Sequence, residues 1–264
     1  MTVAGIVLAG GRSTRMGRPK AALEWHGSTL ARRAVGIVAR AVDGPVIVVR
    51  ATGQELPALP ADVEITDDAR EDRGPLQGIA AGLAAVGDRA DAVFVSAVDA
   101  PLLHPALIAA VLAALAGDEQ LDAALPVAHG FPHPLAAAYR TRIAPHIHDL
   151  LDHDVLGTRP LFERCRVRRL DEQALLAVRA VAEHDPRLDS LRNLNEPAEY
   201  QAARAQPAPL VSVVGDGDVR AATLGAAGEG AATVNGRRID DPHEPLVTGD
   251  VVSFAMRRRY RPAS

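Results

Sequence analysis

The chain has 264 residues with a formal net charge of −4, and its sequence pI is near 6.1. This length can bury a sizeable core in one large domain, or in one medium and one small domain. Because the charge is nearly balanced, binding of polyanions over the whole surface is excluded. No nucleic-acid partner is expected, and any phosphate site has to be local.

Cys165 is the single cysteine of the chain. An intrachain disulfide is therefore excluded, and the chain suits a reducing compartment. No apolar run approaches the length that spans a membrane, and no basic segment precedes the first apolar run. We expect a soluble, cytoplasmic protein without a membrane partner.

The first predicted element is an apolar strand followed by a long glycine-rich loop. Residues 3–8 show no polar alternation, which predicts a parallel strand buried on both faces. The next helix signal comes only at Ser28, and a connection longer than the usual ~2–6 residues is typical of a binding loop. Adjacent glycines, Gly10 and Gly11, let the backbone approach a ligand with its amides turned inward. Positive charge completes a predicted polyphosphate cradle and comes from Arg12, Arg15, Arg18 and Lys20.

Two well-known glycine loops do not fit this segment. Gly10-Gly11-Arg12 lacks the second glycine of the Rossmann fingerprint. Two residues separate Gly17 from Lys20, whereas a Walker loop ends in Gly-Lys-Ser/Thr. The alternative is a glycine-rich surface turn with solvated arginines, but the position at the mouth of a first strand favours phosphate binding.

Strand and helix patterns alternate along the chain that follows. Ser28 is placed to cap the first helix, and a proline stands near the first turn of the second. The alternation predicts an α/β fold with an open, mostly parallel, doubly wound sheet of Rossmann-like type. Further strands are predicted at 45–49, 63–65 (ending at Asp67) and 91–99, and helices from 28, over 74–86 and over 105–116.

Carboxylates follow two of the predicted strands, and they should lie where ligands bind in such sheets. The carboxyl ends of parallel strands share one edge, so the loop after Leu8, Asp67 and Asp99 should face one crevice. A carboxylate beside a phosphate cradle suits Mg²⁺, which is usually held by one or two carboxylates and the substrate's phosphates. The alternative for Asp99 is a helix N-cap, since helix-forming sequence follows it.

Several segments together resemble the ordered motifs of the molybdenum cofactor guanylyltransferases, over residues 1–204. The motifs are the run from Leu8 to Lys20, Gly74-Pro75-Leu76, Asp99-Ala100-Pro101, Pro134-Leu135 with Tyr139, and Asn193-Leu194-Asn195-Glu196-Pro197. The first is shared with other nucleotidyltransferases, including molybdopterin cytidylyltransferase, whereas Asn-x-Asn-x-Pro is more specific. The resemblance implies transfer of GMP from GTP to the terminal phosphate of molybdenum-bound molybdopterin, with release of pyrophosphate.

The resemblance also implies roles for individual residues. Lys20 would hold the phosphates, Asp67 the nucleoside, and Asp99 both the nucleotide and the magnesium, while Asn193 and Asn195 would lie toward the pterin. Partners would be GTP and molybdopterin, with molybdoenzymes or cofactor-biosynthesis proteins as protein partners. Backbone contacts to the nucleotide would come from Leu8, Ala9, Gly10 and Gly11.

The chemistry of this transfer needs few protein groups. A phosphate monoester is largely ionised at neutral pH, so no general base is required to make the nucleophile. Two anions have to be aligned and the charge of the leaving pyrophosphate absorbed, which suits magnesium on Asp99 together with Lys20 and Arg15. His133, in the turn Gly130–Pro134, is a candidate contact to the acceptor.

Two other functions remain open. The family commonly has asparagine just after the second strand, where this chain has Arg50, so use of CTP or transfer to another phosphorylated acceptor is one alternative. A non-catalytic nucleotide-binding regulator is the other, although Arg15, Lys20 and Asp99 are all present. His146, His148 and His153 are interpreted as an exposed polar helix end rather than a metal site, and Cys165 as a non-nucleophilic thiol.

A domain boundary is predicted at residues 205–210, where Pro207 and Pro209 break a helix that begins at Glu196. It separates a nucleotidyltransferase domain, 1–204, from a small β-rich domain, 211–264. Short strands are predicted near 210–214, 232–234 and 250–254. Residues 234–254 resemble the end of a β-grasp sulfur-carrier protein. Because this chain lacks the terminal Gly-Gly of such carriers, the resemblance implies a docking or regulatory appendage.

Overall fold

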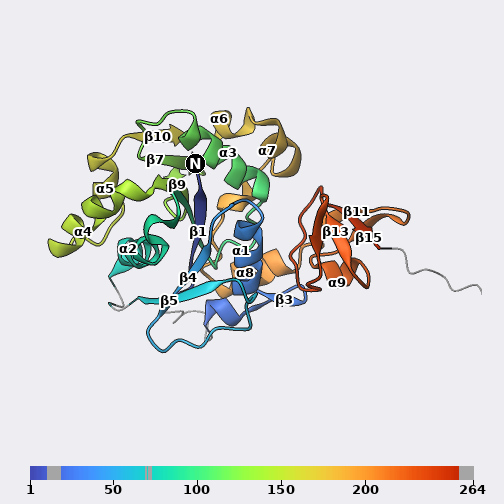
Figure 1. The fold of residues 1–264 in the computed structure, drawn as a ribbon. Helices are drawn as coiled ribbons and strands as arrows, with labels where there is room; N and C mark the ends of the chain where they lie inside the picture. The colour runs from blue at the N-terminus through green and yellow to red at the C-terminus, as the bar shows by residue number, and fades with distance from the viewer. Residues whose placement is uncertain (11–18, 69, 71–72, 256–264) are drawn as a thin grey trace, which may run out of the picture.

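A mostly parallel sheet forms the centre of the larger part of the chain (Figure 1). The computed structural model describes residues 1–10, 19–68, 70 and 73–255. Within these residues the sheet has the order β10-β7-β9-β6-β1-β4-β5, with β8 paired to β7. Its strands are β1 (Val3–Leu8), β4 (Val46–Ala51), β5 (Glu64–Asp68), β6 (Ala92–Ala97), β7 (Ala123–Ala128), β8 (Phe131–Pro132), β9 (Ala136–Arg140) and β10 (Val167–Leu170).

Helices cover both faces of this sheet, which confirms the predicted doubly wound α/β fold. On each face, a separate hydrophobic cluster lies between the sheet and the helices. On one face are α1 (Leu30–Ala39), α3 (Pro105–Ala116), α6 (Glu172–Leu176) and α7 (Arg179–His184). On the other are α2 (Gly74–Val86), α4 (Ala144–Asp152) and α5 (Arg159–Arg164).

The antiparallel strand β9 is the main departure from the simple alternation. It lies between β6 and β7 and pairs antiparallel with both, whereas the other neighbours on the path are parallel. Ala136, the first residue of β9, pairs with Ser96 near the end of β6. The turn that precedes β9, with His133, is therefore brought to the carboxyl edge of the parallel strands.

The start of the first helix differs from the prediction. Ser28 belongs to a small hairpin of β2 (Glu24–Trp25) and β3 (Ser28–Thr29), where it pairs with Trp25. Because the backbone is still extended at Ser28, the helix begins later, and Thr29 Oγ1 accepts the hydrogen bond from Arg32 N at 3.2 Å. The prediction that Ser28 caps the helix was therefore wrong by one residue.

Four short 3-10 helices and α8 complete the described part of this region. They are η1 (Lys20–Ala22), η2 (Gly87–Arg89), η3 (Thr141–Ile143), η4 (Asp189–Leu191) and α8 (Pro197–Arg204). Tyr200 of α8 packs with Trp25 and Leu30 in a small separate cluster, and this packing holds the C-terminal end of the region against the hairpin. No helix in the described ranges is both long and apolar enough to cross a membrane.

Residues 210–255 form a separate five-stranded sheet, called here the C-terminal module. Its order is β12-β11-β15-β13-β14, with β11 and β15 parallel and the other pairs antiparallel. It has its own core, which includes Val211, Leu246 and Val252. The elements are β11 (Leu210–Val213), β12 (Gly217–Arg220), α9 (Leu224–Ala227), β13 (Ala232–Val234), β14 (Arg237–Ile239) and β15 (Val251–Phe254).

The module lies beside α1 in Figure 1. Arg40 forms an ion pair with Asp250, whose side chain is only 2% exposed. A Cβ added to Gly36 would lie 2.5 Å from Pro245 Cδ, so only glycine permits this close approach. The predicted domain limits and the β-grasp resemblance stay predictions.

Candidate functional site

Three predicted site residues from distant parts of the chain meet at the carboxyl edge of the sheet. Lys20 begins η1, Asp99 follows β6, and Asn195 precedes α8. Lys20 Nζ lies 2.9 Å from Asp99 Oδ2 and 2.8 Å from Asn195 Oδ1. The side chains of Lys20 and Asp99 are 18% and 17% exposed, so this cluster is largely shielded from solvent but remains open to a ligand.

The backbone around Asp99 explains why this carboxylate faces the site. After β6 the chain turns, with Ala100 N donating to Ala97 O at 3.3 Å, and Leu194 N donates to Asp99 O at 2.8 Å. The alternative role of Asp99 as a helix cap does not apply, because His104 Nδ1 accepts the hydrogen bond from Ala106 N at the start of α3.

One oxygen of Asp99 has no protein partner among the described residues. Oδ2 accepts from Lys20, whereas Oδ1 is buried without a hydrogen bond. A buried carboxylate oxygen left without a partner costs free energy unless a ligand completes it. This orphaned acceptor is the kind of oxygen ligand that Mg²⁺ prefers.

Asn195 is held in place by the start of α8. Glu199 Oε2 accepts from Asn195 N at 2.9 Å and from Glu196 N at 3.1 Å, as part of a capping box. These two backbone donors hold the pKa of Glu199 below its usual value. The motif Asn-x-Asn-x-Pro is therefore a helix start whose geometry directs one asparagine side chain to Lys20.

The residues that follow β1 run along the end of β4. Ala9 N and Gly10 N both donate to Val49 O, at 2.8 and 3.2 Å, and Leu8 O accepts from Val98 N at 3.1 Å. A Cβ on Gly10 would lie 3.1 Å from Ala51 N, so the close approach favours glycine. The predicted residues Leu8, Ala9 and Gly10 thus lie at the expected edge, whereas Gly11 and Arg15 fall outside the described residues.

Gln54, in the loop after β4, is a contact that the sequence did not suggest. Its Nε2 donates to Ala9 O at 3.0 Å, and its Oε1 accepts from Ala51 N at 3.0 Å. A lone glutamine in a loop carries no pattern, so only the fold reveals that it secures the chain after β1.

Asp67 lies farther along the same edge. It is paired with Arg50 across β4 and β5, and Arg50 Nε lies 2.6 Å from Asp67 Oδ1. Three strand spacings separate β5 from β6, which is about 14 Å. Asp67 is therefore remote from the Lys20 and Asp99 cluster, and the unusual Arg50 has a defined partner.

A pocket of about 610 Å³ adjoins the cluster, and we call it the acceptor pocket after the role predicted from the sequence for two of its residues. It contains two predicted residues, His133 and Asn193, with the 68%-exposed Phe131 also in its wall. His133 Nε2 lies 3.0 Å from Ala128 O, and burial lowers the pKa of His133. The lining residues are His129, Phe131, His133, Arg187, Asp189, Leu191, Arg192, Asn193, Leu194 and Glu199.

The sequence alone did not identify the two arginines that line this pocket, Arg187 and Arg192. Arg187 Nε lies 2.9 Å from Asp189 Oδ2, and Arg192 NH1 lies 3.2 Å from Asp189 Oδ1. Both arginines belong to irregular chain before Asn193, where no periodicity points to a site. The two arginines share the Asp189 carboxylate, and Glu199 lines the same pocket, so the formal charges of the pocket balance.

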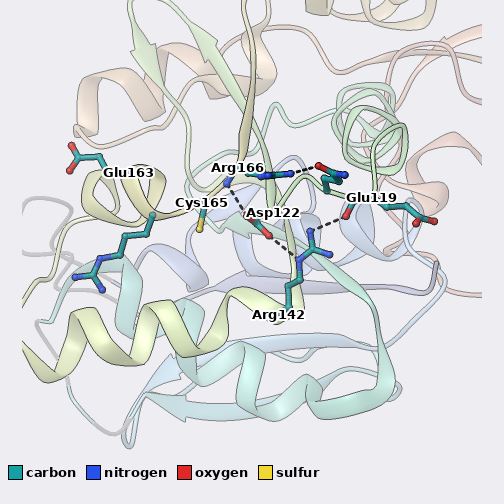
Figure 2. A pocket seen from close by; sticks show the side chains of 8 residues that line it. Glu119, Asp122, Arg142, Glu163, Cys165 and Arg166 are labelled. Atoms are coloured by element: carbon teal, nitrogen blue, oxygen red, sulfur yellow. Dashed lines mark hydrogen bonds and ion pairs between the residues drawn. The ribbon is translucent and has the colours of Figure 1, made fainter.

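A second pocket, of about 710 Å³, lies at the amino ends of β7 and β10, away from the carboxyl edge (Figure 2). Its central carboxylate, Asp122, already has partners within the protein. Arg142 Nε lies 2.9 Å from Asp122 Oδ1, and Arg166 N donates to Asp122 Oδ2 at 2.8 Å. Cys165 also lines it, and burial raises the pKa of this thiol to about 11, which opposes a nucleophilic role.

The histidine-rich helix end does not form a metal site. His153 Nδ1 contacts Asp149 O at 2.7 Å, and both side chains are exposed. Within the described ranges, no group of three or more histidine, cysteine, aspartate or glutamate side chains could hold a metal ion. Among these residues, Asp99 is therefore not part of a ready-made cluster of metal ligands.

The fold of the larger part of the chain is shared with solved structures. Molybdopterin-guanine dinucleotide biosynthesis protein A from Archaeoglobus fulgidus matches with a TM-score of 0.60 and 21% identity, covering 76% of this chain and 96% of that chain. A protein of Mycobacterium tuberculosis H37Rv, solved in complex with manganese, matches with a TM-score of 0.51 and 18% identity, covering 65% and 88%. These likenesses show the fold, an open α/β sheet whose carboxyl edge carries the cluster of Lys20 and Asp99.

The sequence comparisons narrow this class to a family. The family model described as the MobA-like NTP transferase domain matches residues 5–173, and the chain belongs to this family. A relative from Mycobacterium avium, named probable molybdenum cofactor guanylyltransferase, is 41% identical over 166 residues, which cover 62% of this chain and 82% of the relative. The matched segment of the family model ends before the C-terminal module begins.

Proposed function

We propose that this enzyme transfers GMP from GTP to the terminal phosphate of molybdenum-bound molybdopterin, giving the guanine dinucleotide cofactor and pyrophosphate. The observation that supports it best is the convergence of Lys20, Asp99 and Asn195 beside the acceptor pocket. The name of the Mycobacterium avium relative supplies the base and the acceptor.

The reaction joins two anions and expels a third. An oxygen of the acceptor phosphate forms a bond to the α-phosphorus of GTP, and the bond from that phosphorus to the oxygen bridging to the β-phosphate breaks. The electron pair leaves with pyrophosphate. Because the acceptor is already ionised, the protein has to supply alignment and positive charge rather than a base.

Lys20 is the proposed cation for the phosphates. Its ammonium group is held between the carboxylate of Asp99 and the side-chain amide of Asn195. A triphosphate that enters the site therefore meets a positive charge that is already in position. Arg15, outside the described residues, is proposed to assist. Gly10 and Gly11 are proposed to bring backbone close to the nucleotide, with Leu8 and Ala9.

Asp99 is the proposed ligand for a divalent cation, with Mg²⁺ as the physiological ion. Its buried Oδ1 without a protein partner supports this role. When bound, such an ion polarises phosphoryl oxygens and neutralises developing charge. Asp67, paired with Arg50 farther along the edge, is proposed to contact the nucleoside.

The acceptor pocket is the proposed site for the pterin. His133 and Asn193 are its proposed polar contacts, while Phe131 offers an exposed aromatic face to a flat ring system. Asn195, bonded to Lys20, stands where acceptor and nucleotide would meet.

The test measures pyrophosphate release by the purified chain with GTP or CTP, each with and without molybdopterin. Release that requires both GTP and molybdopterin is the expected result. Release with CTP in place of GTP would make the enzyme a cytidylyltransferase. Nucleotide binding without release under any combination would contradict an enzymatic role.

A further inference from the structure

A buried arginine connects the C-terminal module to the loop that carries Asp99. Arg33 lies in α1 and is 5% exposed. Its Nε donates to Pro101 O, two residues after Asp99, and its NH1 donates to Leu246 O of the module at 3.3 Å. A single guanidinium therefore bridges two carbonyl groups that belong to separate parts of the molecule.

The charge of Arg33 is retained at neutral pH despite its burial. Loss of solvent lowers the pKa of this guanidinium to about 10, with Arg40 as the next contributor. Both bonds described above go to carbonyl oxygens, so their geometry determines how well the buried charge is satisfied. If either carbonyl group moved away, a buried N–H group of Arg33 would lose its acceptor. The positions of the Pro101 and Leu246 carbonyl groups are therefore coupled through Arg33.

The same loop has a second, direct connection to the module. His104, at its end, places Nε2 3.0 Å from Thr248 O. Because Nδ1 accepts from Ala106 N, the proton is on Nε2, which donates to Thr248. The loop is also held by Leu194 N, which donates to Asp99 O, and by Ser190 Oγ, which accepts from His104 N at 3.0 Å.

Docking of the module does not depend on Arg33 alone. Arg40 pairs with Asp250, Arg32 pairs with Asp241, and Pro245 packs on Gly36. A change at Arg33 therefore alters the link to the Asp99 loop while other contacts keep the module on α1. This separation makes the link testable in the full chain.

We infer that Arg33 is a positioning residue that transmits the placement of the C-terminal module to Asp99. It sets where the metal-binding carboxylate stands relative to Lys20, and the module serves as a brace for the catalytic loop. The inference rests on the proposed function, in which Asp99 holds a divalent cation beside the nucleotide.

The test compares Arg33→Lys with Arg32→Lys. Lysine keeps the charge at position 33, but a compact ammonium lacks the planar fork that joins both carbonyls. Arg32 is the matched control, because it neighbours Arg33 on α1 and bonds the module at Asp241, while its bond to Ala58 O lies away from the loop. Each protein is measured for hydrogen exchange at the amides of Ala100 and Leu103, for Mn²⁺ binding with GTP by electron paramagnetic resonance, and for kcat and KM.

We expect Arg33→Lys to exchange the two loop amides severalfold faster, to bind Mn²⁺ with GTP severalfold more weakly, and to lose kcat with little change in KM for GTP. Arg32→Lys should match the wild type in all three. If Arg33→Lys does not fold, His104→Asn breaks the second connection, keeps a helix cap and should give the same changes.

Wild-type exchange and Mn²⁺ binding in Arg33→Lys would overturn the inference. Equal effects in Arg32→Lys would also overturn it, since that result would mean general loosening of the module. Failure of the wild type to bind Mn²⁺ with GTP would instead overturn the proposed function. The exchange measurement needs no metal or nucleotide, so the two failures are distinguishable.

Discussion

Replacing Lys20 by alanine should remove most of the catalytic rate and little of the stability. Lys20 Nζ bonds Asp99 and Asn195 at 2.9 and 2.8 Å, and in the proposed reaction it faces the phosphates. Loss of one positioned electrostatic group of this kind typically costs about 10²–10³ in kcat, or about 2.7–4 kcal/mol of transition-state stabilisation. We expect a fall of that size in Lys20→Ala.

The accompanying loss of folding free energy should be about 1–2 kcal/mol. Charge-assisted hydrogen bonds contribute about 1.5–3 kcal/mol when well buried. Lys20 and Asp99 are 18% and 17% exposed, and water can enter the space vacated by the side chain, which reduces that figure. A domain with the usual ~5–15 kcal/mol of stability remains folded after this loss, so unfolding would not explain the lower rate.

The assay is pyrophosphate release with GTP and molybdopterin, together with thermal unfolding by circular dichroism. Lys20→Arg is the matched control, because arginine keeps the positive charge. Lys20 is the only lysine in the chain, and the other strong cations are arginines. We expect this variant to recover little, since a guanidinium cannot occupy the position of a compact ammonium between two oxygens. Near-normal kcat in Lys20→Ala, or full recovery in Lys20→Arg, would refute the reasoning.

Three further predictions concern Asp99, His104 and Glu244. Asp99→Asn should keep the bond to Lys20 but lose metal-dependent turnover by about 10²-fold or more, and an unchanged metal titration of activity would contradict this. Burial lowers the pKa of His104 below 6.5, so the folded state favours the neutral imidazole. The contribution of His104 to the free energy of unfolding is therefore complete above pH 6.5 and is lost as pH falls toward the folded-state pKa. His104→Asn should flatten that part of a plot of unfolding free energy against pH. Burial raises the pKa of Glu244 from 4.5 to about 7. The stability that the protonated carboxyl group gives the protein at low pH is therefore lost as pH rises through 7. Above that pH, Glu244→Gln should unfold at a higher temperature than the wild type.

Much of the carboxyl edge of the sheet could be predicted because its signals are local. The apolar strand at 3–8 and the proline-led helices at 74–86 and 105–116 follow directly from residue pattern. Placing Asp99 near Lys20 then required only the rule that parallel strands share a carboxyl edge. The two side chains indeed lie within hydrogen-bond distance.

Other features depend on contacts between distant segments and left no local signal. The antiparallel β9 is alanine-rich and short, so its direction follows from its neighbours rather than from its own sequence. Arg33 occupies what looks like an ordinary helix, and its buried contacts are with two distant segments, the loop at Pro101 and the C-terminal module at Leu246. Lys20 did carry an overlooked compositional signal, because it is the one lysine in an arginine-rich chain.

The proposed mechanism depends on one claim: Lys20 and Asp99 together receive a nucleoside triphosphate and its divalent ion. Protein labelled with ¹⁵N only at lysine contains one side-chain Nζ, so a single ammonium resonance reports on this site. We predict that this resonance shifts with GTP and again with Mg²⁺, and that Asp99→Asn abolishes the second shift. An ammonium resonance that stays unchanged while calorimetry shows GTP and Mg²⁺ bound would contradict the claim.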